Sequence, residues 1–269
     1  MIQENILLQE ISSKDTCFHC ETLHFGSYAN RMVFATLVAG ATLVSIDKVE
    51  NDNDITIPQL LHVIESSRTT IVYSTPFYLK QLCNHLSYSE EAKQNQKVLL
   101  DKLSTVDLFV CVADVLLPST FDHFTQLFGK NKKLQNALGA SEYGFLMYNP
   151  KGASIKGSIG IPSPFVTIQL MDEQCNPVPR YTAGIIAFKG PKGFNYVGHA
   201  KQIMNECYKD GWNITRDIAV EDKETGYYFM QGRREDLIIL AGENLSVIDT
   251  EEILFKQIRH LALNWLCVV

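Results

Sequence analysis

The sequence lacks two features that would place it in common functional classes: a long hydrophobic run and an excess of basic residues. No uninterrupted apolar stretch reaches the ~20 residues that a membrane-spanning helix needs. Acidic residues (30) outnumber Lys and Arg (24), for a formal net charge of -6, so a basic face for nucleic acid is not implied. The first residues also contain no basic segment followed by an apolar one, which is the pattern of a secretory signal. We expect a cytoplasmic protein that neither spans a membrane nor binds nucleic acid.

A cysteine framework is absent as well. The 7 Cys are odd in number and irregularly spaced, which favours free thiols in a reducing compartment over disulfides. Cys17 and Cys20 form a single C-x-x-C pair, and no second pair follows at the spacing of a zinc site. We therefore expect no structural zinc.

Strand-like and helix-like segments alternate between residues 30 and 140. Short apolar or β-branched runs predict strands at 41–46, 69–73, 108–112 and 134–138. Helices are expected between them, starting near residue 32 and at prolines 58, 76 and 118. This alternation predicts an α/β fold with a doubly wound, mostly parallel sheet. Ligands of such sheets bind beyond the carboxyl ends of the strands, so Gly139–Glu142, directly after a strand, lies where a ligand could bind.

The composition of the chain changes after residue 150. Glycine and proline residues separate short β-rich runs, of which 166–171 and 185–188 are the clearest. Antiparallel strands joined by tight turns have this pattern. A smaller antiparallel β unit is therefore expected to follow the parallel sheet.

Four segments carry the glycine-rich and polar motifs, and the clearest is Gly232–Asn244, which reads G-R-R-E-D-L-I-I-L-A-G-E-N. The other three are Asn136–Gly144, Gly157–Pro179 and Asp210–Ile218. In order and spacing, the four segments resemble the adenylate-forming, or AMP-binding, superfamily of acyl-CoA synthetases, luciferases and peptide-synthetase adenylation domains. The resemblance covers nearly the whole chain.

This resemblance implies three regions and an activity. Residues 1–150 would form the α/β sheet subdomain, 151–231 a β-rich subdomain, and 232–269 the hinge and the beginning of a C-terminal lid. The implied reaction is ATP-dependent activation of a carboxylic acid to an acyl-adenylate, followed by transfer of the acyl group to a thiol such as CoA. The implied cofactors are ATP or AMP, Mg²⁺ and CoA.

The segment that begins at Asn136 resembles the family motif of an aromatic residue followed by Gly-x-Thr-Glu. By this resemblance, Gly139 and Ala140 contribute to nucleotide binding. Ser141 replaces Thr and keeps a hydroxyl that can donate to a phosphate oxygen. Glu142 would hold Mg²⁺, a hard ion that prefers carboxylate oxygen. Taken alone, this segment could also be an ordinary loop after a strand that happens to contain Ser and Glu.

The segment Asp210–Ile218 resembles the family pattern D-G-W-x-x-T-G-D-L. Asp217 takes the place of the family Asp that accepts hydrogen bonds from both ribose hydroxyls, a task that suits the two acceptor oxygens of a carboxylate. Arg216 stands where the family has Gly, and it would be strained if that position required positive φ. The alternative for Asp217 is a salt-bridged side chain in a β-turn.

In the segment Gly232–Asn244, the resemblance implies three roles. Arg233 would contact ribose or phosphate through its fixed fork of donors. Glu235 occupies the hinge position about which the lid swings between half-reactions. Gly242 would let the backbone approach the pantetheine arm of the thiol acceptor. Ser141, Glu142 and Arg233 are thus the expected catalytic residues. The alternative for this segment is an exposed hairpin of mixed charge.

Two further positions are candidates for the acyl site. Val112–Pro118 resembles the family's G-G-E-x-L-x-P loop, and His19 is a candidate for a family His near the acyl group. A packing role is the alternative for His19.

Residues 1–30 contain nothing similar to the family phosphate loop G-T-T-G-x-P-K, and the lid Lys of the family would lie beyond residue 269. We therefore expect this chain alone to be inactive or weakly active, with a complementary chain as one candidate partner. Two alternatives remain open. One is a non-catalytic nucleotide-binding or interaction protein of the same fold. The other is part of a peptide-synthetase adenylation module, which would use a carrier-protein thiol.

Overall fold

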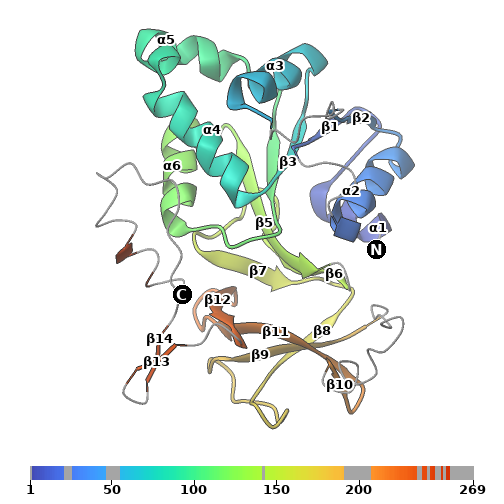
Figure 1. Cartoon of the computed structure of the whole chain (residues 1–269). Helices are drawn as coiled ribbons and strands as arrows, with labels where there is room; N and C mark the ends of the chain where they lie inside the picture. Colours follow the sequence, from blue (N-terminus) through green and yellow to red (C-terminus); the bar gives the residue numbers. More distant parts are fainter. Residues whose placement is uncertain are drawn as a thin grey trace.

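The structure, a computed structural model, describes residues 2–20, 26–46, 55–140, 143–190, 207–234, 238–240, 243–245, 250 and 253–254. The N-terminal part forms the parallel half of a mixed sheet (Figure 1). In order across the sheet, its strands are β2 (Thr42–Val44), β1 (Thr16–His19), β3 (Ile71–Ser74), β4 (Leu108–Cys111) and β5 (Lys133–Ala140). All neighbouring pairs among them are parallel. The predicted parallel α/β sheet is confirmed.

Helices cover both faces of this parallel half (Figure 1). Helices α1 and α2 pack on one face with Cys17 and Ile71 of the strands. Helices α3, α4 and α6 pack on the other face with Phe18 and Phe109. The helices are α1 (Ile2–Gln9), α2 (Gly26–Val38), α3 (Ile57–Ser67), α4 (Pro76–Tyr88), α5 (Glu90–Asp101) and α6 (Pro118–Phe128).

Local sequence explains where several of these helices begin. The N–H of Gln59 donates to the Thr56 hydroxyl at 3.4 Å, and the side-chain oxygen of Gln59 accepts from the Thr56 N–H at 3.0 Å, which caps α3 reciprocally. Pro76 and Pro118 are the first residues of α4 and α6. The N–H at the first position of a helix has no partner within the helix, so proline, which lacks this N–H, costs no hydrogen bond there. The predicted helix starts at the prolines are confirmed.

The antiparallel half continues the same sheet in the order β5-β6-β7-β12-β11-β9-β8, with β10 paired to β11. It begins where β6 turns back along β5. The expected antiparallel unit is confirmed, and the boundaries at residues 150 and 231 stay predictions. The strands are β6 (Gly144–Tyr148), β7 (Ser158–Pro162), β8 (Thr167–Met171), β9 (Gly184–Lys189), β10 (Tyr208–Lys209), β11 (Trp212–Glu221) and β12 (Tyr228–Arg233), and β13 (Ile238–Leu240) and β14 (Glu243–Leu245) form a separate hairpin.

A buried polar junction connects the two halves. Asn149 follows β6 and is fully buried. Its side-chain oxygen accepts from the Ile155 N–H at 3.1 Å and from the Ser158 hydroxyl at 2.7 Å. Its side-chain nitrogen donates to the carbonyl oxygens of Asn136 and Ser158, both at 3.1 Å. One side chain therefore ties β5, the loop after β6 and the start of β7.

Burial should make the core cysteines unreactive in the native protein. The six described cysteines are free thiols, as predicted. Burial raises the pKa of Cys17 to about 11 and that of Cys83 to about 12, and the thiolate is the reactive form. With iodoacetamide at pH 8, we expect Cys83 to be labelled no faster than the protein unfolds, whereas the half-buried Cys175 reacts faster than Cys83. Peptide mapping by mass spectrometry measures both, and equal native labelling rates would contradict the expectation.

Candidate active site

The carboxyl ends of the parallel strands meet at one edge of the sheet. His19 ends β1 opposite Tyr73 of β3, and Cys111 ends β4 opposite Asn136 of β5. Strand β5 continues beyond this point to Ala140. The end of β5 therefore extends past the edge at which sheets of this kind bind ligands.

Gly139 and Ala140 lie in the hairpin where β5 turns into β6. They pair with Phe145 and Gly144, respectively. A Cβ at Gly139 would lie 2.6 Å from the carbonyl oxygen of Gly144, so only glycine fits at this close approach of two strands. Glycine is thus required at position 139 for a structural reason. Its role in nucleotide binding stays a prediction.

Asp217 and Arg233 are the two predicted site residues that the structure brings together. They lie directly opposite each other on the antiparallel strands β11 and β12. Asp217 is only 6% exposed, and its Oδ1 lies 3.4 Å from Nε of the exposed Arg233. The Asp217 N–H donates to the Thr215 hydroxyl at 3.1 Å. The arrangement presents a buried carboxylate beside an arginine that still offers donors to solvent.

This geometry bears on the alternative that Asp217 is a salt-bridged side chain in a β-turn. The ion pair exists, but Asp217 lies within the strand β11 rather than in a β-turn. Its neighbour Arg216 is exposed and is not among the described non-glycine residues with positive φ. An arginine therefore replaces the family glycine here without left-handed backbone strain. Because successive side chains of a strand point to opposite faces of the sheet, the Arg216 side chain lies on the face opposite to that of Asp217.

His19 lies buried at the carboxyl edge. Its ring stacks on Tyr73 with centroids 4.4 Å apart and planes at 14°. Its Nε2 is buried and makes no hydrogen bond within the part of the chain that the structure describes. Burial lowers the pKa of His19 to about 4, so the imidazole is neutral at pH 7. The stacking on Tyr73 agrees with the alternative that His19 has a packing role. Its role at the acyl site stays a prediction.

A strained residue lies in the loop after β4, which the resemblance connected with the acyl site. Ala113 has φ of +76°, a left-handed conformation that costs an L-residue roughly 1–2 kcal/mol. Strain of this kind collects at functional sites. Sequence reasoning did not identify Ala113, although the family pattern G-G-E in this loop contains the glycines that tolerate such a backbone.

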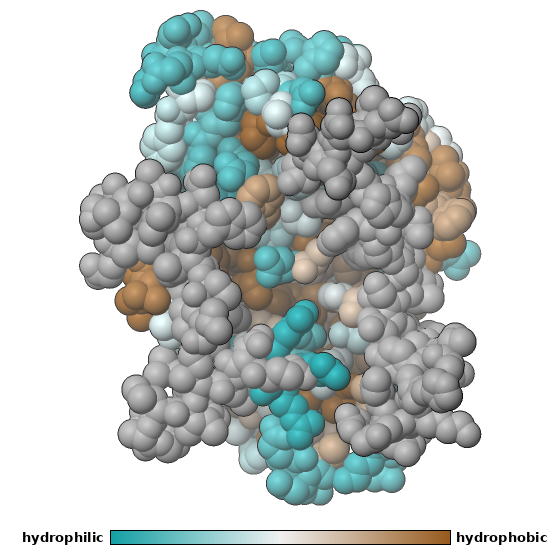
Figure 2. Space-filling view, in the orientation of Figure 1, coloured by the Kyte–Doolittle hydropathy of each residue, from teal (hydrophilic) through white to brown (hydrophobic). Residues whose placement is uncertain are grey.

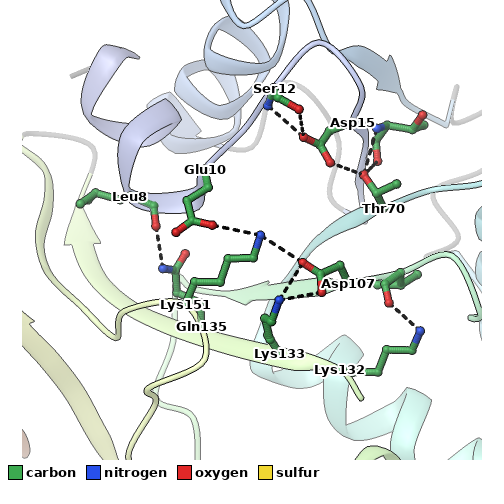
Figure 3. Close-up of polar contacts among 12 residues, drawn as sticks. Leu8, Glu10, Ser12, Asp15, Thr70, Asp107, Lys132, Lys133, Gln135 and Lys151 are labelled. Atoms are coloured by element: carbon green, nitrogen blue, oxygen red, sulfur yellow. Dashed lines mark hydrogen bonds and ion pairs between the residues drawn. The ribbon is translucent and has the colours of Figure 1, made fainter. Parts of the chain in front are cut away.

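Ion pairs occupy the opposite edge, where the parallel strands begin (Figure 3). Asp107 precedes β4, and its carboxylate oxygens lie 2.9 Å from Nζ of Lys133 and 3.0 Å from Nζ of Lys151. Lys151 also lies 3.5 Å from Glu10, directly after α1. Burial opposes ionisation of Asp107, but the two lysines outweigh it and hold the pKa of the carboxyl below its usual range. These groups satisfy one another, which indicates a structural role.

Four of the predicted site residues, Ser141, Glu142, Glu235 and Gly242, lie outside the described residues. Their roles with phosphate, Mg²⁺, hinge and pantetheine stay predictions. Among the residues that are described, no group of three or more His, Cys, Asp or Glu is placed to hold a metal ion. Across the same residues, no helix has the length and apolar character needed to cross a membrane.

Comparison with known proteins identifies the family to which the chain belongs. The family model described as AMP-binding enzyme matches residues 2–196. The chain belongs to this AMP-binding family of adenylate-forming enzymes.

Curated relatives agree with this assignment. The chain is 26% identical to the 3-hydroxybenzoate–CoA ligase of Aromatoleum over 243 residues, which is 88% of this chain and 42% of the relative. It is 34% identical to the long-chain-fatty-acid–CoA ligase of Salmonella typhimurium over 101 residues, which is 38% of this chain and 18% of that one. The chain spans less than half the length of these relatives.

Solved structures share the fold. The anthranilate CoA ligase AuaEII, in complex with anthranoyl-AMP, matches with a TM-score of 0.82 and 20% identity, over 98% of this chain and 47% of that one. O-succinylbenzoate coenzyme A synthetase from Bacillus subtilis, in complex with ATP and magnesium ion, matches with a TM-score of 0.77 and 19% identity, over 95% of this chain and 49% of that one. The predicted fold class is confirmed.

Proposed function

We propose that this chain contributes the nucleotide-binding part of an ATP-dependent acid–thiol ligase. In the reaction, a carboxylate oxygen attacks the α-phosphorus of ATP, and the bond to the departing pyrophosphate breaks. The sulfur of a thiol such as CoA then attacks the acyl carbonyl, AMP leaves, and the thiol proton passes to solvent. The observation that carries the proposal is the pairing of Asp217 with Arg233 in a chain of the AMP-binding family.

Asp217 and Arg233 have complementary parts in this proposal. The carboxylate of Asp217 has acceptors only, and two neighbouring ribose hydroxyls can both donate to it. Because Asp217 is buried within β11, its position is fixed before the nucleotide binds. Arg233 is exposed, with donors that can reach ribose or phosphate.

The remaining site residues extend the proposal from the family pattern. The Ser141 hydroxyl donates to a phosphate oxygen, and Gly139 and Ala140 position that loop. Glu142 would hold Mg²⁺, which neutralises phosphate charge when it is bound. Glu235 serves as the hinge and Gly242 faces the pantetheine arm. Relatives named for aromatic and fatty acids give no single acyl substrate for this chain.

Titration of AMP tests the proposal. Asp217→Asn replaces one acceptor oxygen by a donor group, and we expect AMP affinity to fall by about 10- to 100-fold, the value of losing hydrogen bonds to a charged group. Isothermal titration calorimetry measures the affinity. The control is Asp222→Asn, directly after β11, which should bind AMP like the wild type.

Two outcomes would contradict the proposal. Equal AMP affinity for Asp217→Asn and wild type would remove Asp217 from the nucleotide site. No saturable binding by the wild type would favour a structural or interaction protein of the same fold that does not bind nucleotide. The adenylation-module alternative predicts AMP binding together with acyl transfer to a carrier-protein thiol rather than to CoA.

A further inference from the structure

Strand β11 is bulged against β9 in the segment that carries Asp217. Ile214 pairs with Ala187 of β9. The next pair along the strands is Ile218 with Ile185. Three residues of β11, Thr215–Asp217, therefore face a single residue of β9, which is the mismatch that defines a β-bulge. Regular pairing with β9 does not hold the backbone of this segment in place.

The hydroxyl of Thr215 holds the backbone of Asp217 within this bulge. It accepts a hydrogen bond from the Asp217 N–H at 3.1 Å and donates to the Asp217 carbonyl oxygen at 3.5 Å. Threonine hydroxyls can bond the backbone two residues along the chain in this way. Because Thr215 is only 7% exposed, water has little access to these groups. One side chain thus contacts both backbone polar groups of the residue that carries the carboxylate.

The side chains of Thr215 and Asp217 lie on the same face of the sheet. Both are buried, whereas Arg216 between them is exposed, as alternate positions of a strand require. On its other side, Asp217 pairs with Arg233 of β12. Figure 2 shows hydrophilic residues gathered in the lower centre of the molecule, where Figure 1 places β11 and β12. The Asp217 carboxylate belongs to this polar region, and its direction depends on how the bulge is held.

We propose that Thr215 is a positioning residue, which sets the direction in which the Asp217 carboxylate meets the two ribose hydroxyls. This inference rests on the proposed function. Bulges re-aim side chains, and a binding group is directed accurately only when neighbouring hydrogen bonds fix it. Without the Thr215 hydroxyl, the buried Asp217 N–H loses its acceptor, and the backbone shifts. Thr215 acts through Asp217 and not by contact with the nucleotide.

Two nucleotides separate positioning from a role in folding. Isothermal titration calorimetry measures the affinity of the full chain for AMP and, in displacement mode, for 2′,3′-dideoxy-AMP, which lacks both ribose hydroxyls. Thr215→Val removes the hydroxyl and keeps the branched shape, and Thr215→Ala provides a second variant without the hydroxyl. Thr215→Ser keeps the hydroxyl. Circular dichroism and thermal unfolding verify that each variant folds.

The matched control is Thr36→Val in α2. Thr36 is also buried, with 0% exposure, and its hydroxyl donates to the Met32 carbonyl oxygen at 2.9 Å. The control therefore removes a buried threonine hydroxyl and its hydrogen bond to the backbone in a different part of the fold. It should bind both nucleotides like the wild type.

We expect Thr215→Val and Thr215→Ala to bind AMP about fivefold more weakly than the wild type, the value of one ordinary hydrogen bond. Their affinity for dideoxy-AMP should equal that of the wild type, because this ligand has no hydroxyls for Asp217 to accept from. Thr215→Ser should restore AMP binding. Unchanged AMP affinity without the hydroxyl overturns the inference, and so does an equal loss for both nucleotides, which indicates a role in folding alone.

Failure of the proposed function has a different signature. Equal AMP affinity for Asp217→Asn and the wild type removes Asp217 from the ribose site, and the inference falls with it. If Asp217→Asn weakens AMP binding but Thr215→Val and Thr215→Ala do not, the proposed function stands and the inference alone is overturned.

Discussion

Replacing Asn149 by alanine should lower the free energy of unfolding by about 3 kcal/mol. The side chain is fully buried and makes four hydrogen bonds that join β5, the loop between β6 and β7, and β7 itself. Alanine leaves the Ile155 N–H without that acceptor and opens a cavity at the junction. The carbonyl of Asn136 keeps its bond from the Asn149 backbone at 2.9 Å, which limits the loss.

Urea unfolding followed by far-UV circular dichroism measures this change. The matched control is Asn131→Ala, because Asn131 is exposed in the turn before β5. The control should alter the free energy of unfolding by less than about 0.5 kcal/mol. If Asn149→Ala also stays within that range, the junction contributes little and the two halves of the sheet are held by other contacts.

Lowering the pH from about 6.5 to about 4 should remove about 3 kcal/mol of stability through His19 alone. Burial lowers the pKa of His19 in the folded protein to about 4, whereas the unfolded chain titrates near the usual value. Between these values the unfolded state binds more protons, so stability falls as the pH falls. Above this window the stabilising effect is fully present, and below it no further loss comes from this group.

The variant His19→Phe tests the assignment of this acid sensitivity. Phenylalanine can keep the stack on Tyr73, and the buried Nε2 gives up no hydrogen bond with any described residue. Urea unfolding at a series of pH values should give a flatter profile than the wild type between pH 6.5 and 4. The control His62→Phe, at an exposed position of α3, should keep the wild-type profile. An unchanged slope in His19→Phe would assign the acid sensitivity to other groups.

Much of the fold could be predicted because local patterns and tertiary structure agree. Prolines mark the starts of α3, α4 and α6, and apolar runs mark β3, β4 and β5. Strand β1 is different: its sequence Thr-Cys-Phe-His mixes polar and apolar residues and has no strand signature. It is buried because neighbours cover both faces, and only the assembled sheet shows that. Helix α5 was also missed, since only Ala92 and Leu99 of its residues are buried.

The candidate site was predicted residue by residue, but its geometry was not. The motifs named Asp217 and Arg233 separately as nucleotide contacts, and nothing in their spacing shows that they face each other. That pairing depends on the β-bulge between Ile218 and Ala219, which shifts the register of β11 against β12. Ala113 was missed because alanine carries no sign of positive φ. Such features depend on backbone conformation, which a short motif does not encode.

The order of the strands in the sheet also has a consequence for synthesis on the ribosome. Strand β7 pairs with β6 on one side and with β12 on the other, yet β12 is made after β8, β9, β10 and β11. The parallel half can fold as it emerges, while β7 waits for its second partner. The carboxylate of Asp217 and the guanidinium of Arg233 therefore come together only after β12 has been made. A nascent chain released before β12 would contain Asp217 but not Arg233, the residue that faces it across the two strands.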